Sequence, residues 1–402
     1  MDPDRTESTQ ESTPEPSALS TPRSTGRSPW VYGLFAGLSL YMFLAAIKVM
    51  GGGLKQIGDN SDVIENIMGG ADNPLVALFG AMLVTAIVQS SSFTTALIIT
   101  LTGYGQMPVE TAIFAVMGAN IGTSVTNAIV SLGQLRIRKQ FRRAFSAAIV
   151  HDFFNWLTVL VLLPIEWISG EMREDGHGIL MRFSEWAAQF FSSTSIDKPF
   201  NPIKWAVSPV VDAIKAISHL FGDSPLLQGT VVAIVGLILL FASLIFLVKN
   251  LKGALLRRLE GLFRRVFFRN DLIAYTVGCL TTILVQSSSV TTSLIVPLAG
   301  AGAVKLRRVY PYTLGANLGT TMTGVIAATA NPEPRAVAVA IAHVTFNLVG
   351  TAIWYPLRAI PISLARGYGR LAARSKRYAI LFLLVMFLVV PIVGIVVSEL
   401  LF

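Results

Sequence analysis

The chain has 402 residues, of which 53% are hydrophobic and 14% charged, with a net charge of +9. Soluble globular chains average roughly 25% charged residues, so this composition excludes an ordinary soluble domain and indicates many membrane spans. The basic residues cluster in short segments between apolar spans, which follows the positive-inside rule and excludes nucleic acid as a partner. The lone Cys279 lies in an apolar stretch, so no disulfide can form within the chain.

Residues 1–29 are rich in Ser, Thr, Pro and Glu and contain no apolar run, so we predict a disordered N-terminal tail. We predict that the rest is an all-α, multi-spanning membrane protein. Its expected parts are a membrane repeat at 30–170, an extracytoplasmic connector at 171–228, a second membrane repeat at 229–358, and a basic loop with a C-terminal transmembrane helix at 359–402.

Charge placement predicts how the two repeats are oriented. Basic segments at 136–143, 249–269, 305–308 and 358–377 are assigned to the cytoplasm. The uncharged stretch 74–104 must then start and finish outside, whereas the uncharged stretch 272–304 must start and finish inside. Each is long for one crossing and short for two, so each predicts a re-entrant helical hairpin with a broken helix. The two repeats would therefore have inverted topology.

Both predicted hairpins carry the same polar string. Val-Gln-Ser-Ser-Ser occurs at 88–92 and 285–289, and Gly-Ala-Asn-x-Gly-Thr follows at 118–123 and 315–320. The spacing from Gln to Asn is identical (120 − 89 = 31 and 317 − 286 = 31). A polar string that is duplicated in apolar sequence predicts a transporter with its site between two repeats.

The residue types of the string suit small ions. Helix N-termini at a break carry positive partial charge and favour an anion, while hydroxyls and carbonyls favour a hard cation such as sodium. Neither tip carries Lys or Arg, so bound cations would control anion affinity. The structural alternative is that these serines and threonines only join helices, and that Gly118, Gly122, Gly315 and Gly319 only allow close helix packing.

Asp152 is the only acidic residue deep in a predicted span. It could bind a cation or couple transport to charge, because an unpaired carboxylate is costly there. Alternatively, it could lie at the membrane boundary and pair with Arg142 or Arg143. The second repeat has Val344 at the matching position, whereas His151 and His343 match each other and are expected to form hydrogen bonds between helices, with proton coupling as the alternative.

No enzyme site is visible in the sequence. It has no Gly-x-Ser-x-Gly frame, Walker loop, zinc pair or dinucleotide fingerprint. We therefore predict a transporter driven by ion gradients, with no organic cofactor. A sodium-coupled carboxylate or sulfate carrier and a channel or signalling scaffold remain alternatives at this point.

The duplicated Gln-Ser-Ser-Ser string, the stretch 118–127 and the stretch 141–157 resemble the type II sodium-dependent phosphate cotransporter family in a bacterial-type version. The resemblance implies a symporter that imports inorganic phosphate with co-transported sodium. The expected phosphate-binding residues are Gln89, Ser90, Ser91, Ser92, Gln286, Ser287, Ser288, Ser289, Asn120 and Asn317. The expected sodium ligands are Gln286, Ser287, Thr320, Thr323, Asp152, Asn155 and Thr123.

The resemblance also implies properties of the whole protein. Electrogenic members carry Asp at the position of Asp152, so net charge movement is expected. The expected location is the bacterial inner (plasma) membrane, with the lipid bilayer as partner and a monomer as the functional unit, a dimer being the alternative. A strict count of spans leaves the C-terminus outside, although the family's termini are usually inside.

Overall fold

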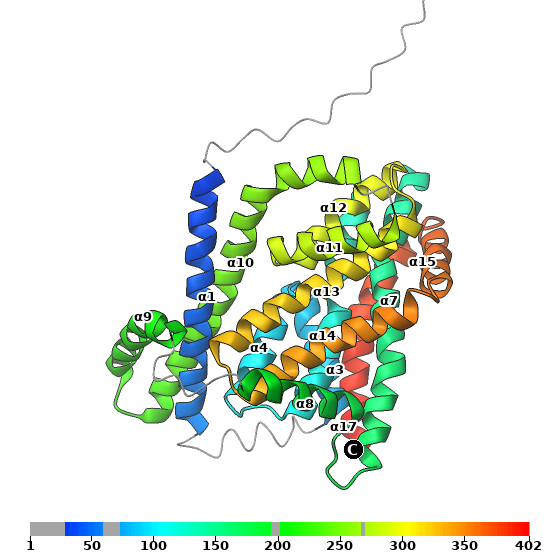
Figure 1. Cartoon of the computed structure of the whole chain (residues 1–402). Coiled ribbons are helices and arrows are strands. Elements are labelled where there is room, and N and C mark those ends of the chain that lie inside the picture. Colours follow the sequence, from blue (N-terminus) through cyan, green and yellow to red (C-terminus); the bar gives the residue numbers. More distant parts are fainter. Residues whose placement is uncertain (1–28, 59–72, 194–201, 267–269, 402) are drawn as a thin grey trace, which may run out of the picture.

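Figure 1 shows the computed structural model of the chain, which describes residues 29–58, 73–193, 202–266 and 270–401. Within these ranges the chain is helical apart from short connections, with no strand, which confirms the predicted all-α fold. Six helices among the described residues are long and apolar enough to cross a membrane, which confirms a multi-spanning protein. Residues 1–28 of the predicted tail lie outside the described residues.

The helices follow one another in two comparable halves. The first half contains α1 (Pro29–Gly58), α3 (Pro74–Val88), α4 (Ser91–Gly103), α5 (Val109–Gly122), α6 (Val125–Leu132) and α7 (Arg138–Glu171). The predicted connector contains α8 (Ile179–Ser193), α9 (Pro202–Ser218) and the short 3-10 helix η1 (His219–Phe221). The second half contains α10 (Pro225–Val266), α11 (Asp271–Val285), α12 (Ser288–Ala301), α13 (Leu306–Ala330), α14 (Pro334–Trp354), α15 (Ala359–Ala372), α16 (Lys376–Leu384), the π-helical turn η2 (Val385–Val389) and α17 (Val390–Leu401).

Each predicted hairpin is a pair of short helices that meet at its glutamine. Gln89 separates α3 from α4, and Gln286 separates α11 from α12. Both glutamines have φ = 57°, and they are the only non-glycine residues with positive φ in the described part of the chain. Figure 1 shows α3 and α4 in the lower half of the bundle and α11 and α12 in the upper half. This arrangement supports the predicted inverted topology, which stays a prediction.

Two glycines set the distance between each hairpin and the next helix. A Cβ on Gly118 of α5 would lie 1.8 Å from the carbonyl oxygen of Leu78 in α3. The matching Gly315 of α13 would place a Cβ 1.9 Å from the carbonyl oxygen of Tyr275 in α11. Only glycine permits this backbone contact, so the close-packing explanation of these glycines is confirmed.

A helix break follows the hairpin in one half only. In the first half, α5 ends at Gly122 and α6 begins at Val125, with Thr123 and Ser124 between them. In the second half, α13 continues without a break from Leu306 to Ala330. The sequence predicted a broken helix in each repeat without placing it; beyond the hairpin itself, only the first repeat has one. A break interrupts backbone hydrogen bonds and frees carbonyl groups, so the two halves differ at this level.

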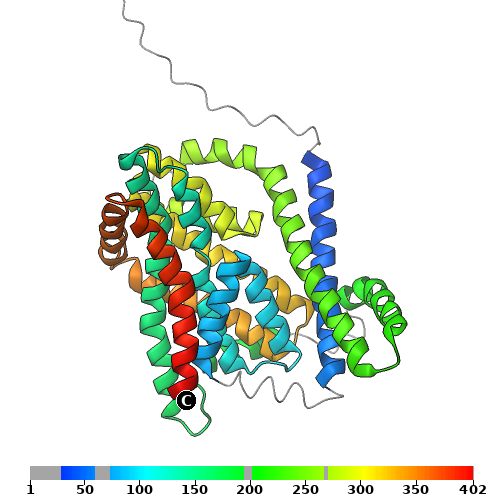
Figure 2. The ribbon, with the colours of Figure 1, turned by 180° about the vertical axis from the view of Figure 1, so that it is seen from behind.

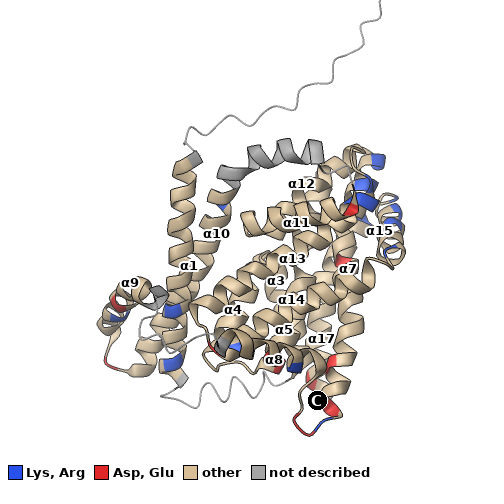
Figure 3. Cartoon of the chain, in the orientation of Figure 1, with Lys and Arg blue, Asp and Glu red and all other residues tan. Residues whose placement is uncertain are grey.

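The two ends of the bundle differ in charge. Figure 3 shows Lys and Arg gathered around α15 and the start of α7, whereas acidic residues lie at the opposite end, near the α7–α8 connection. By the positive-inside rule, the α15 end is predicted to face the cytoplasm. The end of α17 lies opposite α15 (Figures 1 and 2), as the strict count of spans predicts. In both views α1 and α10 lie side by side at one edge of the bundle.

An ionic cluster fixes the start of the second hairpin at the basic end of the bundle. Asp271, the first residue of α11, pairs with Arg308 at the start of α13 and with Arg358 just after α14, and it accepts a hydrogen bond from Tyr355 (3.1 Å). Burial alone would raise the pKa of Asp271, but the hydrogen bonds and the two arginine charges outweigh it and lower that pKa. The cluster therefore joins the hairpin to α13 and to the α14–α15 connection.

The contact between α3 and α5 yields a stability prediction. Gly118→Ala should destabilise the folded protein by about 2 kcal/mol or more, because the new methyl group would meet the Leu78 carbonyl. Gly80→Ala in α3 is the matched control, since a Cβ there meets nothing within 4 Å and alanine favours helix. Thermal unfolding of the two purified variants should show a lower midpoint for Gly118→Ala only. Equal midpoints would contradict the packing argument.

Candidate functional site

A cavity of about 440 Å³ lies between the two hairpin tips and α10. Its polar lining comes from Gln89, Ser90, Ser92, Thr126, Gln286, Ser287, Ser289 and Ser293. Its apolar wall belongs mainly to α10, where the Phe241 ring meets the Phe93 ring edge-on with centroids 5.3 Å apart. Lys249, exposed on α10 toward the basic end of the bundle, also lines the cavity. The tips therefore share one cavity, which reaches toward the basic end of the bundle.

Both tips are built by the same local hydrogen bonds. The backbone N–H of Gln89 donates to the carbonyl of Thr85 (2.7 Å), and the Ser90 hydroxyl accepts from the N–H of Phe93 (3.2 Å). In the second tip, Gln286 and Ser287 make the corresponding bonds to Thr282 (2.6 Å) and Val290 (3.3 Å). Each serine thus caps the N-terminus of the helix that follows it. Two helix N-termini reach one cavity, an arrangement that favours an anion.

Three oxygen-bearing residues meet behind the second tip. The Thr323 hydroxyl donates to Oε1 of Gln286 (3.0 Å) and lies 3.3 Å from the Ser92 hydroxyl. The Ser92 hydroxyl lies 3.3 Å from the carbonyl oxygen of Gln286. All three residues are buried, so the group offers neutral oxygens from both hairpins and α13 in a closed space. Such a donor set suits a small hard cation.

Asp152 is buried beside the break between α5 and α6. One of its carboxylate oxygens accepts a hydrogen bond from the Ser124 hydroxyl, while Oδ2 has no hydrogen-bond partner among the residues that the structure describes. Arg142 and Arg143 lie more than two helical turns earlier in α7, and no ion pair joins either of them to Asp152 within the described chain. The alternative that Asp152 pairs with Arg142 or Arg143 is therefore wrong.

The α5–α6 break also contacts the second tip. The Ser289 hydroxyl donates to the carbonyl of Thr123 (3.3 Å), and the next residue, Ser124, binds Asp152. A short path of contacts thus runs from the cavity to the buried carboxylate. Ser124 was not among the residues predicted from the sequence. The only signal in the sequence was its place directly after the first Gly-x-Asn-x-Gly-Thr string.

Several predicted site residues belong to a buried network instead of the cavity lining. Nε2 of His151 lies 2.9 Å from Oδ1 of Asn317, and Nε2 of His343 lies 3.4 Å from Oδ1 of Asn120. Asn155 donates to the Asn120 carbonyl (2.6 Å) and accepts from Asn317 (2.9 Å). The network joins α5, α7, α13 and α14, so the predicted helix-to-helix role of the histidines is confirmed.

The remaining predicted residues lie close to the tips without lining the cavity. Ser91 and Ser288 are the buried first residues of α4 and α12, and Thr320 donates to the carbonyl of Ala316 in its own helix (3.1 Å). Direct ion contacts of these residues, and of Asn120, Asn317 and Asn155, stay predictions. A contact that sequence reasoning missed joins Asn127 of α6 to Thr292 of α12 (2.7 Å). It has no counterpart in the second half because Gly324 replaces the asparagine.

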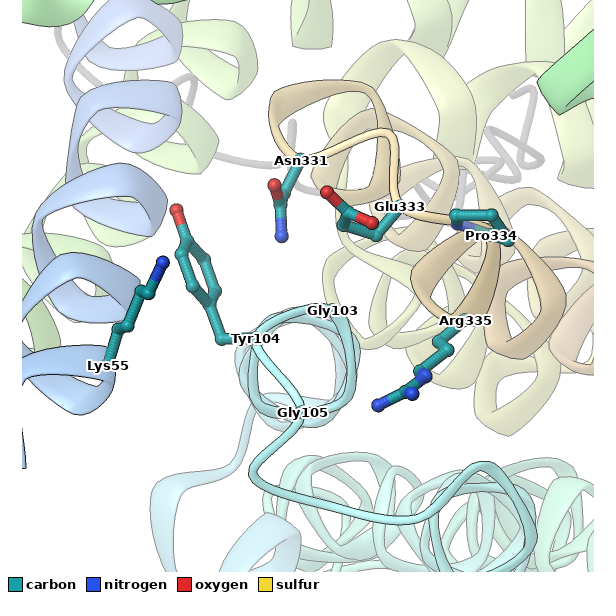
Figure 4. Close-up of a pocket in the computed structure, with 8 residues that line it drawn as sticks. All are labelled: Lys55, Gly103, Tyr104, Gly105, Asn331, Glu333, Pro334 and Arg335. Carbon is teal, nitrogen blue, oxygen red and sulfur yellow. The ribbon is translucent and has the colours of Figure 1, made fainter. Parts of the chain in front are cut away.

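A second pocket, of about 640 Å³, lies at the opposite end of the bundle (Figure 4). Figure 4 shows Lys55 reaching from α1 toward the ring of Tyr104, with Asn331 and Glu333 facing them. Tyr104 is packed on α1 so closely that a Cβ on Gly51 would lie 1.8 Å from its ring. Beside it, Lys48 donates to Oδ1 of Asn331 (3.2 Å). These contacts close the outer end of α4 against α1 and α13, and the two pockets share no lining residue.

Comparison with known proteins gives a consistent result. The profile of the Na+/Pi-cotransporter family matches residues 42–163 and 238–371. The chain is 32% identical to sodium-dependent phosphate transport protein 2A of Rattus norvegicus, over 95% of this chain and 70% of that protein. It is 32% identical to protein 2B of Bos taurus (88% and 63%) and 34% identical to protein 2A of Mus musculus (88% and 65%). The chain thus spans between 63% and 70% of the length of these relatives. No solved structure matches it.

The oxygen group behind the second tip yields a binding prediction. Sodium chloride should raise the unfolding midpoint of the purified chain above its value in choline chloride, because a bound cation stabilises the folded state. Thr323→Val should lose most of this gain, since it keeps the shape of the side chain and removes one ligand; a tenfold loss of affinity corresponds to about 1.4 kcal/mol. Thr329→Val, an exposed change in the same helix, should keep the gain. A full gain in Thr323→Val would rule out this cation site.

Proposed function

Because the chain belongs to the Na+/Pi-cotransporter family, we propose that it is a sodium-coupled symporter that imports inorganic phosphate. The matched regions include both hairpins, the α5–α6 break and the α7 segment with Asp152. The observation that carries the proposal is the cavity between two serine-capped helix N-termini.

Phosphate would lie in the cavity against both helix N-termini. Ser90 and Ser92 from one tip and Ser287 and Ser289 from the other supply hydroxyl groups there. Gln89 is the exposed member of the glutamine pair, so its amide is available to the anion. A tetrahedral anion has four oxygens, and donors that approach from two opposed hairpins suit it better than a planar carboxylate, which two donors on one side can satisfy.

Sodium would occupy the oxygen group of Gln286, Thr323 and Ser92. Two of these residues belong to the hairpin tips, so a cation there would hold the tips in one relative position. Because no Lys or Arg lies at either tip, the bound cation also supplies positive charge near the anion. Anion affinity would therefore depend on sodium, as symport requires.

An inward-facing state of an alternating-access cycle would account for this geometry. The cavity extends along α10 to Lys249 near the cytoplasmic end, while the Tyr104, Lys48 and Asn331 contacts close the opposite end. In the cycle, sodium and phosphate would bind from outside, and opening toward Lys249 would release both into the cytoplasm. We place the protein in the plasma membrane as a multi-pass transporter that acts as a monomer, without an enzymatic step or organic cofactor.

Asp152 would make the transport electrogenic. It is buried, its Oδ2 has no hydrogen-bond partner among the described residues, and the Ser124 hydroxyl at the α5–α6 break donates to its other carboxylate oxygen. A sodium ion bound there would compensate the buried carboxylate. The second half offers Val344 at the matching position, so this cation would have no counterpart.

Substitution of Gln286 tests the site. Gln286→Gly should reduce sodium-dependent phosphate uptake into proteoliposomes by about tenfold or more, because it removes the amide oxygen proposed as a sodium ligand; a tenfold loss corresponds to about 1.4 kcal/mol. Glycine accepts the left-handed backbone of this position, so the variant should fold. Gln286→Ala removes the same amide but strains the backbone, and should lower the unfolding midpoint as well. Normal uptake by a folded Gln286→Gly protein would refute the role of the tip.

A competition experiment tests the substrate. Excess sulfate or dicarboxylate should not compete with labelled phosphate for uptake; strong competition would favour a sodium-coupled carboxylate or sulfate carrier.

Asp152→Asn tests charge movement. Wild-type proteoliposomes should give an inward current on a sodium jump in the presence of phosphate, and the variant should lose most of that current, because the amide removes the charge that attracts the additional cation. The matched control is Asp175→Asn, which removes one exposed carboxylate outside the membrane core and should keep the current. An undiminished current in Asp152→Asn, or no current in the wild type, would overturn the electrogenic proposal.

A further inference from the structure

A large basic pocket lies at the cytoplasmic end of the bundle, away from the transport cavity. It has a volume of about 780 Å³ and is bounded by the start of α7, the end of α12, the start of α13 and one face of α15. Its cationic lining residues are Arg142, Arg143, Lys305, Arg307, Arg366 and Arg370. No acidic residue of the described part of the chain lines it, and it shares no described residue with the cavity between the hairpin tips.

These six cations have no carboxylate partner among the residues whose side chains the structure describes. The ion pairs in that part of the chain use other basic groups, and the nearby Arg308 and Arg358 are both taken by Asp271. Lys305 is the N-cap of α13, and no side chain caps this helix start. The positive end of the α13 dipole therefore adds to the six charges. Such a concentration of positive charge attracts a polyanion.

The size of the pocket limits the ligand. Its volume equals the share of roughly 25 water molecules at about 30 Å³ each, so one orthophosphate ion would leave most of it unfilled. A group with two phosphates, or one phosphate attached to a polar body, fits better. Arginine forks match phosphate oxygens in pairs, and four arginines come from two different helices, α7 and α15.

The faces of α15 indicate where the ligand comes from. Pro361, Ile362, Ala365, Gly369 and Ala372 form its buried face. Ser363, Arg366 and Arg370, at helical spacing, form the face that lines the pocket. On the other side of this basic face, Ile360 and Leu364 are 44% and 42% exposed, next to Leu357 at 49%. A basic stripe beside an exposed apolar stripe is the pattern of a helix that lies in the membrane interface.

We propose that this pocket binds a phosphate-bearing polyanion, and that an anionic phospholipid of the cytoplasmic leaflet supplies it. Its headgroup would enter between α7 and α15, and its acyl chains would lie along Leu357, Ile360 and Leu364. Basic pockets between membrane helices on the cytoplasmic side have the chemistry that holds lipid phosphates. A bound headgroup would join the end of α12, the second arm of the second hairpin, to α7 and α15.

The test measures binding to the purified full chain in neutral detergent, with fluorescent short-chain phosphatidic acid as the probe. Arg366→Gln with Arg370→Gln should weaken binding by about tenfold or more, because each basic residue near an anionic lipid contributes about 1 kcal/mol. The matched control is Arg374→Gln with Arg377→Gln, which removes the same charge from exposed residues after α15 that do not line the pocket. Both pairs are exposed, so both proteins should fold, and their unfolding midpoints verify this.

Each outcome decides the proposal. If only the Arg366/Arg370 variant loses binding of the phosphatidic acid probe, and pyrophosphate displaces the probe from the unmodified protein, the pocket is a phosphate site. Glycerol 3-phosphate then separates the sources: weak binding supports the lipid, whereas binding as tight as that of phosphatidic acid assigns the site to a soluble anion and overturns the lipid assignment. The proposed binding role of the pocket would be overturned if both variants lost binding equally or if neither lost it. It would also be overturned if a neutral phosphatidylcholine probe bound as tightly as phosphatidic acid.

Discussion

The structure depends on one constraint: a helix that ends inside a membrane must satisfy its backbone polar groups without water. Each hairpin tip meets this constraint with a left-handed glutamine, whose N–H closes the first helix, and a serine, whose hydroxyl caps the second. The left-handed conformation costs roughly 1–2 kcal/mol for a residue with a side chain. Glycine would avoid that cost but would supply no amide, so the presence of glutamine at both tips is consistent with a role for its side chain in the site.

The position of each tip within the bundle is fixed by helix–helix contacts that lie away from the tip itself. Gly118 and Gly122 let α5 approach the carbonyls of α3, and Gly315 and Gly319 do the same for α13 and α11. The hairpins are thereby fixed to the helices that carry the histidine–asparagine network. That network crosses between the halves, because His151 reaches Asn317 and His343 reaches Asn120. A change in the relative position of the halves must therefore break or shift buried hydrogen bonds, which favours discrete states over gradual deformation.

Much of this arrangement could be predicted from the sequence because it depends on local chemistry. The duplicated string located both tips, and the absence of charge around them indicated hairpins. The unbroken course of α13 could not be predicted, since its Gly-x-Asn-x-Gly-Thr string matches the one at the α5–α6 break and only tertiary packing separates the two outcomes. For the same reason, the sequence shows that Asn120 and Asn317 are polar and repeated, but not that the amide oxygen of each lies against a histidine of the other half. Ser124 was missed because it becomes notable only beside Asp152.

The asymmetry between the halves indicates how one site can hold ions of opposite charge. The Gln286 side chain is buried and bonded to Thr323 at 3.0 Å, whereas its counterpart Gln89 is exposed in the cavity and lies 3.5 Å from Thr126. The Ser92 hydroxyl donates a hydrogen bond to the Gln286 carbonyl. The matching Ser289 hydroxyl donates instead to the carbonyl of Thr123, next to the Ser124–Asp152 pair. The second tip thus closes around oxygens suited to a cation, and the first stays open to the cavity. In the proposed symporter, the duplicated string supplies both tips, and the single carboxylate, reached through Ser289 and Thr123, supplies the charge that a symmetric site would lack.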